Sequence, residues 1–159
     1  MPRHFPKGAE WRVWDLQVHT PYSEVNNGFG SDLNEYAKQF FTRAVEKNVA
    51  VIGVTDYFIA EGYRFLKDLQ ADDVPLKDIV GEDIFERAKD ITLFANVELR
   101  TSILVDGNRV NYHVIFSNEV SADEITEDFL AELHFTSEGN PGSADQRDSL
   151  TKRNLERLG

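Results

Sequence analysis

The segment Asp15-Leu16-Gln17-Val18-His19 places polar side chains at every second position. Alternate side chains of a β-strand point to opposite faces, so Asp15, Gln17 and His19 are predicted to share one face. At the carboxyl end of an inward-facing barrel strand, such side chains can meet a substrate or a metal ion. The same alternation also describes a half-exposed antiparallel strand with a solvated polar face, and this alternative stays open.

Three further ionisable side chains lie in or just after other predicted strands. Asp56 directly follows a short apolar run, Glu98 lies near the end of the next strand, and His113 lies in the strand after it. Because sites in parallel α/β folds form at the carboxyl ends of strands, these residues are predicted to gather with Asp15 and His19. Imidazole and carboxylate groups suit Zn²⁺ or Mn²⁺, which can activate water for hydrolysis. The alternatives are that the acids are helix caps or loop anchors and that His113 is a hydrogen-bonded core histidine.

Hydrophobic periodicity predicts the elements that position these residues. The predicted strands cover residues 12–19, 49–55, 92–99, 101–105 and 110–116, and the predicted helices cover residues 32–47, 60–69, 78–89, 121–133 and 149–159. Asp106-Gly107 indicates a hairpin turn, Ser121 with Glu124 indicates a capping box, and residues 135–148 read as a loop. Strands that alternate with helices predict an α/β fold with a mostly parallel sheet and one β-hairpin.

Composition narrows the function classes. The chain has 159 residues and no cysteine, which excludes disulfides and thiolate zinc sites and is compatible with a cytoplasmic location. No apolar run is long enough to span a bilayer, so we expect no membrane association. The net charge of −11 argues against binding a nucleic-acid backbone without help from other domains. A closed α/β barrel takes ~250 residues, so we expect this chain to be the N-terminal portion of a longer protein.

Four short motifs, in chain order, resemble those of the PHP (polymerase and histidinol phosphatase) superfamily. They are WDLQVHTP at residues 14–21, VTDY at 54–57, NVEL at 96–99 and YHVI at 112–115. Within that superfamily the chain is most similar to the N-terminal part of TrlF-like proteins, which are large ATPases that begin with a PHP-type domain. The segments that carry this closer similarity are residues 5–11, 56–58, 62–63, 98–100, 113–117 and 154–159.

The resemblance implies an incomplete (β/α)7 barrel-like fold that hydrolyses a phosphate ester, including one in nucleic acid, at a site of two or three divalent metals. His19 would be the second imidazole of the first motif, Glu98 a carboxylate that bridges metals, and His113 a further ligand. Asp15 would orient the ligating histidines, as carboxylates behind metal-bound imidazoles commonly do, and Asp56 would be the acidic member of the second motif. A downstream ATPase region would complete the protein.

The chain also departs from the family pattern. Gln17 stands where the family has its first histidine, and an amide oxygen is a poorer ligand for Zn²⁺ or Mn²⁺, so metal binding is predicted to be weak or absent. Tyr57 stands where many PHP enzymes have histidine, and the family's late Asp-x-His pair does not occur in residues 1–159. Two interpretations follow: a metal-dependent phosphoesterase with a depleted site, or a catalytically inactive scaffold or partner-binding domain. Outside the family, a small-molecule-binding α/β domain stays open.

Overall fold

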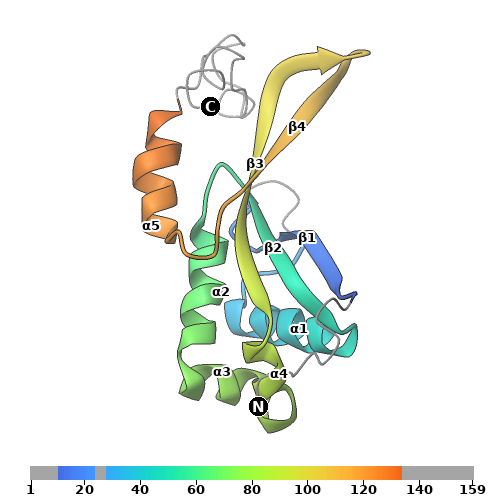
Figure 1. Cartoon of the computed structure of the whole chain (residues 1–159), viewed down its shortest axis with the longest axis vertical. Helices are drawn as coiled ribbons and strands as arrows, with labels where there is room; N and C mark the ends of the chain where they lie inside the picture. The colour runs from blue at the N-terminus through green and yellow to red at the C-terminus, as the bar shows by residue number, and fades with distance from the viewer. Residues whose placement is uncertain (1–10, 24–27, 134–159) are drawn as a thin grey trace.

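The computed structural model describes residues 11–23 and 28–133, which form a mixed α/β structure around one curled sheet (Figure 1). The strands are β1 (Val13–His19), β2 (Val49–Tyr57), β3 (Thr92–Val105) and β4 (Asn108–Ile115). They lie in chain order, with β1, β2 and β3 parallel and β4 antiparallel to β3. The predicted α/β class, with parallel strands and one hairpin, is confirmed. The four strands form a half-barrel, and they do not establish a seven-stranded one.

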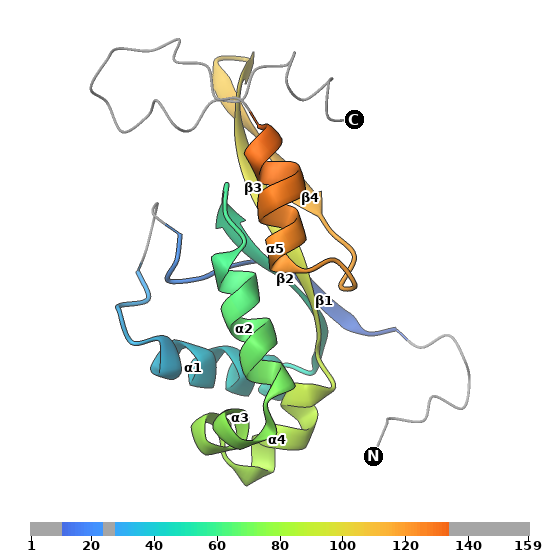
Figure 2. The same cartoon turned by 90° about the vertical axis from the view of Figure 1, so that its left-hand side faces the viewer.

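The helices of the described residues follow the strands in the alternating order expected of βα units. They are α1 (Leu33–Glu46), α2 (Glu61–Ala71), α3 (Asp73–Val80), α4 (Glu82–Lys89) and the short α5 (Ala122–Glu124). Figures 1 and 2 show α1 to α4 gathered at the lower end of the molecule, while the β3–β4 hairpin extends away from them. None of these helices is long and apolar enough to cross a membrane.

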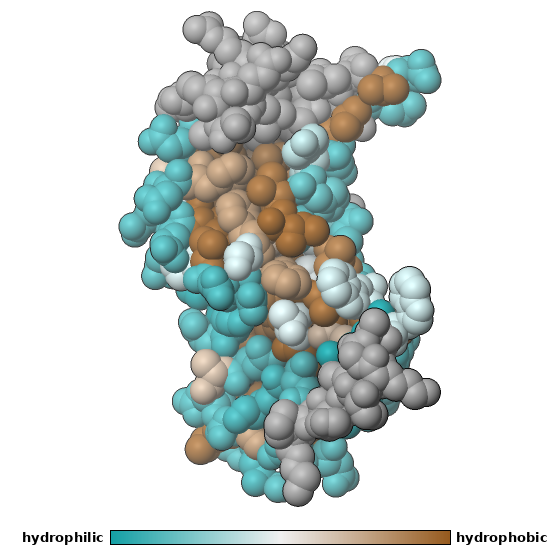
Figure 3. Space-filling model, in the orientation of Figure 1, coloured by the Kyte–Doolittle hydropathy of each residue, from teal (hydrophilic) through white to brown (hydrophobic). Residues whose placement is uncertain are grey.

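The two faces of the sheet differ in composition. One face packs against the helices, and its residues Ile52, Val54, Leu93, Ala95 and Val97 belong to the buried core. We call the other side the open face, because Trp14 and Ile115, which lie on it, stay 61% and 46% exposed. In Figure 3, apolar side chains run down the middle of the view, flanked by hydrophilic ones.

The predicted helix at residues 78–89 is wrong in its bounds, because two short helices cover this region. Gly81 separates α3 from α4 with φ +83°, a conformation that side chains other than glycine rarely adopt. The Asp72–Pro75 segment, which lies outside the predicted helices, begins α3. Asp72 caps the helix by accepting from the Val74 amide, and Pro75 lies in the first turn, where its missing N–H is not needed.

The hairpin prediction is confirmed, although the strands differ from those predicted. β3 continues from Thr92 to Val105 without the predicted interruption, and the turn residues Asp106 and Gly107 have φ of 50° and 78°. Ser121 and Glu124 form the predicted capping box. The helix after them is irregular, with a π-helical stretch (Ile125–Phe129) and a 3₁₀ turn (Leu130–Glu132). The loop predicted at 135–148 and the helix predicted at 149–159 lie outside the described residues.

A β-bulge in β1 breaks the strict alternation predicted for this strand. Asp15 pairs with Ile52 and Val18 with Val54, so β1 holds one residue more than β2 between these pairs. A Cβ at Gly53 would lie 2.2 Å from the Leu16 carbonyl oxygen, so glycine is required for this close approach of the two strands. The bulge reverses the face on which Asp15 lies relative to Gln17 and His19.

Candidate functional site

The site is built around Glu98, whose side chain is only 1% exposed although it lies on the open face of β3. Its Oε2 lies 3.3 Å from His19 Nε2, 3.4 Å from Gln17 Nε2 and 4.0 Å from His113 Nε2. Its Oε1 accepts a hydrogen bond from Asn111 Nδ2. The sheet register explains this convergence, because Glu98 pairs with His113 on β4 and His19 lies at the carboxyl end of β1. The buried carboxylate on β3 is therefore surrounded by nitrogen atoms from the two strands β1 and β4.

A chain of hydrogen bonds fixes the orientation of the His19 ring. Ser23 Oγ donates its proton to Asp56 Oδ1 at 2.7 Å, so at 3.2 Å from His19 Nδ1 it can only accept. Nδ1 of His19 therefore carries a proton, and the neutral ring has its lone pair on Nε2, facing Glu98. Tyr57 stacks on the same ring with a centroid distance of 5.1 Å.

The ring of His113 is fixed in the same way by Asn96. The Nδ2 group of Asn96 donates to the Leu16 carbonyl oxygen at 2.7 Å and to Thr55 Oγ1 at 3.0 Å. Its Oδ1 is then the atom that lies 3.2 Å from His113 Nδ1, and a carbonyl oxygen can only accept. His113 thus also carries its proton on Nδ1 and turns a bare Nε2 toward Glu98.

Two imidazole lone pairs and one carboxylate oxygen consequently face the same small volume. Like-charged or electron-rich atoms repel each other at these distances unless a cation or a proton lies between them. His19 and His113 are the ion-pair partners of Glu98 among the described side chains. The arrangement therefore needs either a proton held between these groups or a metal ion, and imidazoles with hydrogen-bonded outer nitrogens are typical of metal sites.

The distances fit this donor set in part. Two ligands of a tetrahedral Zn²⁺ lie ~3.3 Å apart when each is ~2.0–2.1 Å from the metal, and His19 Nε2 and Glu98 Oε2 are 3.3 Å apart. The 4.0 Å between His113 Nε2 and Glu98 Oε2 is longer, so His113 would have to approach by less than ~1 Å. As the described side chains stand, no group of three or more His, Cys, Asp or Glu residues is arranged to hold a metal.

Gln17 occupies the place that the family resemblance assigns to a histidine, and its amide acts differently. Its Nε2 donates to Glu98 Oε2 at 3.4 Å, so it partly satisfies the carboxylate that a metal would otherwise neutralise. An amide N–H has no lone pair for a metal. The structure thus places a hydrogen-bond donor beside Glu98 at residue 17.

Asp56 lies on the helix-covered side of β2, not beside Glu98. It is 2% exposed, and it accepts from the Thr20 amide at 3.1 Å, from Thr20 Oγ1 at 2.8 Å and from Ser23 Oγ at 2.7 Å. Burial raises the pKa of its carboxyl group, while these hydrogen bonds and His19 oppose the rise. Gly62 lets α2 approach, since a Cβ there would lie 2.1 Å from Asp56 Oδ2. Asp56 anchors the turn after β1 and reaches His19 through Ser23.

Asp15 does not join the other predicted site residues. Because of the β1 bulge it lies with Val18 on the side of β1 that faces α1, where both line a pocket. The prediction that Asp15 shares a face with Gln17 and His19 is therefore wrong, as is the prediction that it lies beside Glu98. An Asp15 contact that the structure shows is a 3.4 Å hydrogen bond from the Gln17 amide.

Several residues of the site were not predicted from the sequence. Ser23 orients His19, while Asn96 and Asn111 hold His113 and Glu98. Two signals could have indicated them: Asn96 precedes Glu98 by two residues and Asn111 precedes His113 by two, which places each pair on one face of its strand. Comparison with protein-family models, with curated proteins and with solved structures found no match for this chain.

Proposed function

We propose that this chain is the opening part of a PHP-type metal-dependent phosphoesterase or nuclease-like domain with a depleted metal site. His19, Glu98 and His113 would hold a divalent ion, Zn²⁺ or Mn²⁺, and Gln17 replaces a further imidazole. The wider protein would include a downstream ATPase region and would act on phosphate esters or nucleic acid. The proposal draws on the sequence resemblance. The strands lie in the sheet in the same order as in the chain, which is compatible with the first units of a barrel.

The observation that carries this proposal is the shared orientation of the two histidines. Independent hydrogen bonds, from Ser23 on one side and Asn96 on the other, leave both Nε2 lone pairs directed at one buried Glu98 oxygen. A histidine that served only packing would need no such agreement with a second one 94 positions away along the chain. This agreement supports a site that selects a cation.

A bound divalent ion would supply Lewis-acid chemistry, which stabilises charge that develops on a phosphoryl oxygen. The chain's own residues have separate tasks. Ser23 and Asn96 set the proton positions of the two imidazoles, and Asn111 holds the second oxygen of Glu98 so that Oε2 stays turned toward them. Tyr57 stacks on one side of the His19 ring and supports its orientation.

The second candidate function is an inactive PHP-like scaffold or partner-binding domain. Gln17 favours it, because its amide gives Glu98 a neutral hydrogen-bond partner that needs no metal. In this case a proton between Glu98 and the histidines takes the place of the metal ion. The cluster then stabilises the sheet without chemistry.

The two candidates differ in the response to Gln17→His. We expect the variant to bind Mn²⁺ or Zn²⁺ at least about tenfold more tightly than the parent chain and to cleave bis(p-nitrophenyl) phosphate. Gln39→His on the exposed side of α1 is the matched control, and it should change neither property. A Gln17→His chain that folds but binds no metal would contradict the phosphoesterase function and favour the scaffold function.

A further inference from the structure

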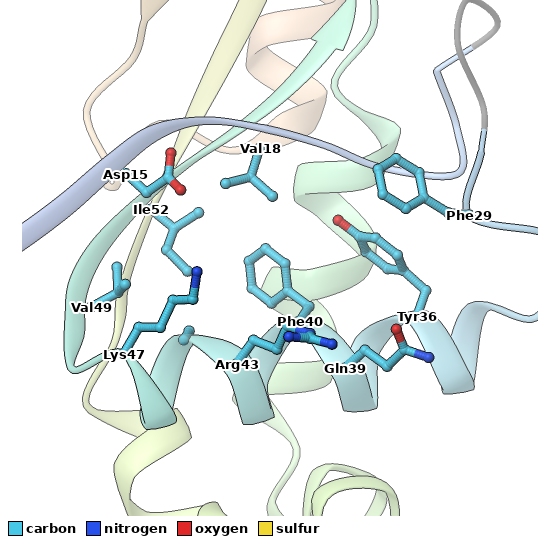
Figure 4. Close-up of a pocket in the computed structure, with 11 residues that line it drawn as sticks. Asp15, Val18, Phe29, Tyr36, Gln39, Phe40, Arg43, Lys47, Val49 and Ile52 are labelled. Atoms are coloured by element: carbon cyan, nitrogen blue, oxygen red, sulfur yellow. The ribbon is translucent and has the colours of Figure 1, made fainter.

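A pocket of about 300 Å³ lies between β1, β2 and α1, on the side of β1 away from Glu98 (Figure 4). Pockets for small organic ligands have volumes of roughly 300–1,000 Å³, so this one is large enough for a compact molecule of one or two rings. Its strand side is formed by Val18, Val49 and Ile52, and its helix side by residues of α1, by Phe29 before this helix and by its C-cap Lys47. The pocket is separate from the Glu98 site and has no part in the function proposed above.

The helix side of the pocket is aromatic. Phe29 and Tyr36 are in edge-to-face contact at 5.3 Å, and Tyr36 and Phe40 follow at 5.9 Å. Tyr36 is held in place because its hydroxyl donates to the His19 carbonyl oxygen at 2.7 Å. These rings present a preformed surface against which a flat apolar group can pack.

The rim of the pocket is cationic, in a chain whose net charge is −11. Arg43 and Lys47 both line it and lie four residues apart, which places them on the same side of α1. Neither has an ion-pair partner among the described side chains. With Asp15 across the pocket, two cations and one carboxylate leave a local charge of +1, which attracts an anion.

We propose that this pocket binds an aromatic carboxylate. The ring packs between the aromatic side chains of the helix side and the apolar residues of β1 and β2, and the carboxylate lies between Arg43 and Lys47. The guanidinium of Arg43 can donate two parallel hydrogen bonds to a carboxylate, and the Lys47 ammonium adds a point charge. Asp15 disfavours a second negative charge on the ligand.

The test uses 2-naphthoate and its neutral counterpart 2-naphthamide, titrated calorimetrically into the chain. We expect 2-naphthoate to bind with a dissociation constant of about 1 mM or below and 2-naphthamide to bind at least about threefold more weakly. Arg43→Gln and Lys47→Gln should each weaken 2-naphthoate by about threefold or more and leave 2-naphthamide unchanged. Lys38→Gln, an exposed cation on α1 outside the pocket, is the matched control and should change neither.

Amide chemical shifts then locate the ligand. Shifts confined to β1, the start of β2 and α1 support the proposal. Three results would overturn it: no binding of 2-naphthoate, equal binding of the amide, or the same loss of affinity in Lys38→Gln as in Arg43→Gln. All three substitutions replace exposed side chains, so the variants should fold like the parent chain.

Discussion

Ser23→Ala tests the hydrogen-bond chain that orients His19. Ser23 is 1% exposed, and its hydroxyl donates to Asp56 at 2.7 Å and lies 3.2 Å from His19 Nδ1. The substitution leaves the Nδ1 proton of His19 without its partner and removes one of the hydrogen bonds to the Asp56 carboxylate. A hydrogen bond to a charged group contributes roughly 1.5–3 kcal/mol, so we expect the free energy of unfolding to fall by about 2 kcal/mol.

For a domain of this size, that loss corresponds to a Tm lower by ~4–8 °C. Urea unfolding gives the free energy, and ¹⁵N NMR of the imidazole gives the proton position, which should change from Nδ1 alone to a mixture of Nδ1 and Nε2. Ser117→Ala is the control, because the hydroxyl of the exposed Ser117 accepts one hydrogen bond among the described residues, from the Glu119 amide at 3.3 Å. Unchanged stability together with an unchanged proton position in Ser23→Ala would show that Ser23 does not orient the His19 ring.

Two more predictions concern the strands beside the site. Gly53→Ala should lower the free energy of unfolding by about 1–3 kcal/mol and shift the NMR signals of His19, because the new Cβ would lie 2.2 Å from the Leu16 carbonyl oxygen. Gly28→Ala is the control, because a Cβ at Gly28 would have no atom within 4 Å. Equal effects of the two substitutions in urea unfolding would contradict the role of the bulge. Asp56→Asn should change the pH dependence of stability. Burial raises the pKa of Asp56 in the folded state, so its contribution to stability is present at low pH and is lost as the pH rises through that raised value. In urea unfolding from pH 4 upward, the free energy of unfolding of Asp56→Asn should therefore rise relative to that of the parent chain. The opposite trend would mean that hydrogen bonding outweighs burial in setting the pKa of Asp56.

The sequence predicted the elements best where one physical signal dominates. The continuous apolar run that became β2 indicates a strand buried on both faces, and Asp106-Gly107 adopts the positive φ angles that this pair favours. Ser121 and Glu124 likewise form a capping box whose spacing alone specifies it. These features depend on neighbouring residues, so they can be inferred without knowing the tertiary structure.

The position of Asp15 shows where such inference ends. Strict alternation puts it beside His19, but the backbone of β1 gains a residue against β2 at the bulge, and only the pairing of the two strands reveals this. Asp56 is similar: the sequence predicted it just after a strand, whereas it lies within β2 and is buried by its contacts with the Thr20–Ser23 turn. Register between distant strands decides both cases.

The convergence of His19, Glu98 and His113 was predicted from strand ends and motifs, and the structure places the Nε2 atoms of both histidines within 4.0 Å of Glu98 Oε2. Their roles as metal ligands stay predictions. The proton positions that make both histidines face Glu98 depend on Ser23 and Asn96, which are polar residues of ordinary types. Nothing in their local sequence marks them as partners of the histidines.

The most direct test of the central claim is a calorimetric titration of Zn²⁺ into the parent chain, Glu98→Gln and Gln17→His. We expect weak binding by the parent chain, binding at least about tenfold tighter by Gln17→His, and none by Glu98→Gln. Each imidazole should bind through Nε2 while Nδ1 keeps its proton, which ¹⁵N NMR of the same samples reports. Equal affinities in all three proteins would mean that Zn²⁺ binds elsewhere and that Glu98 does not form a metal site with the two histidines.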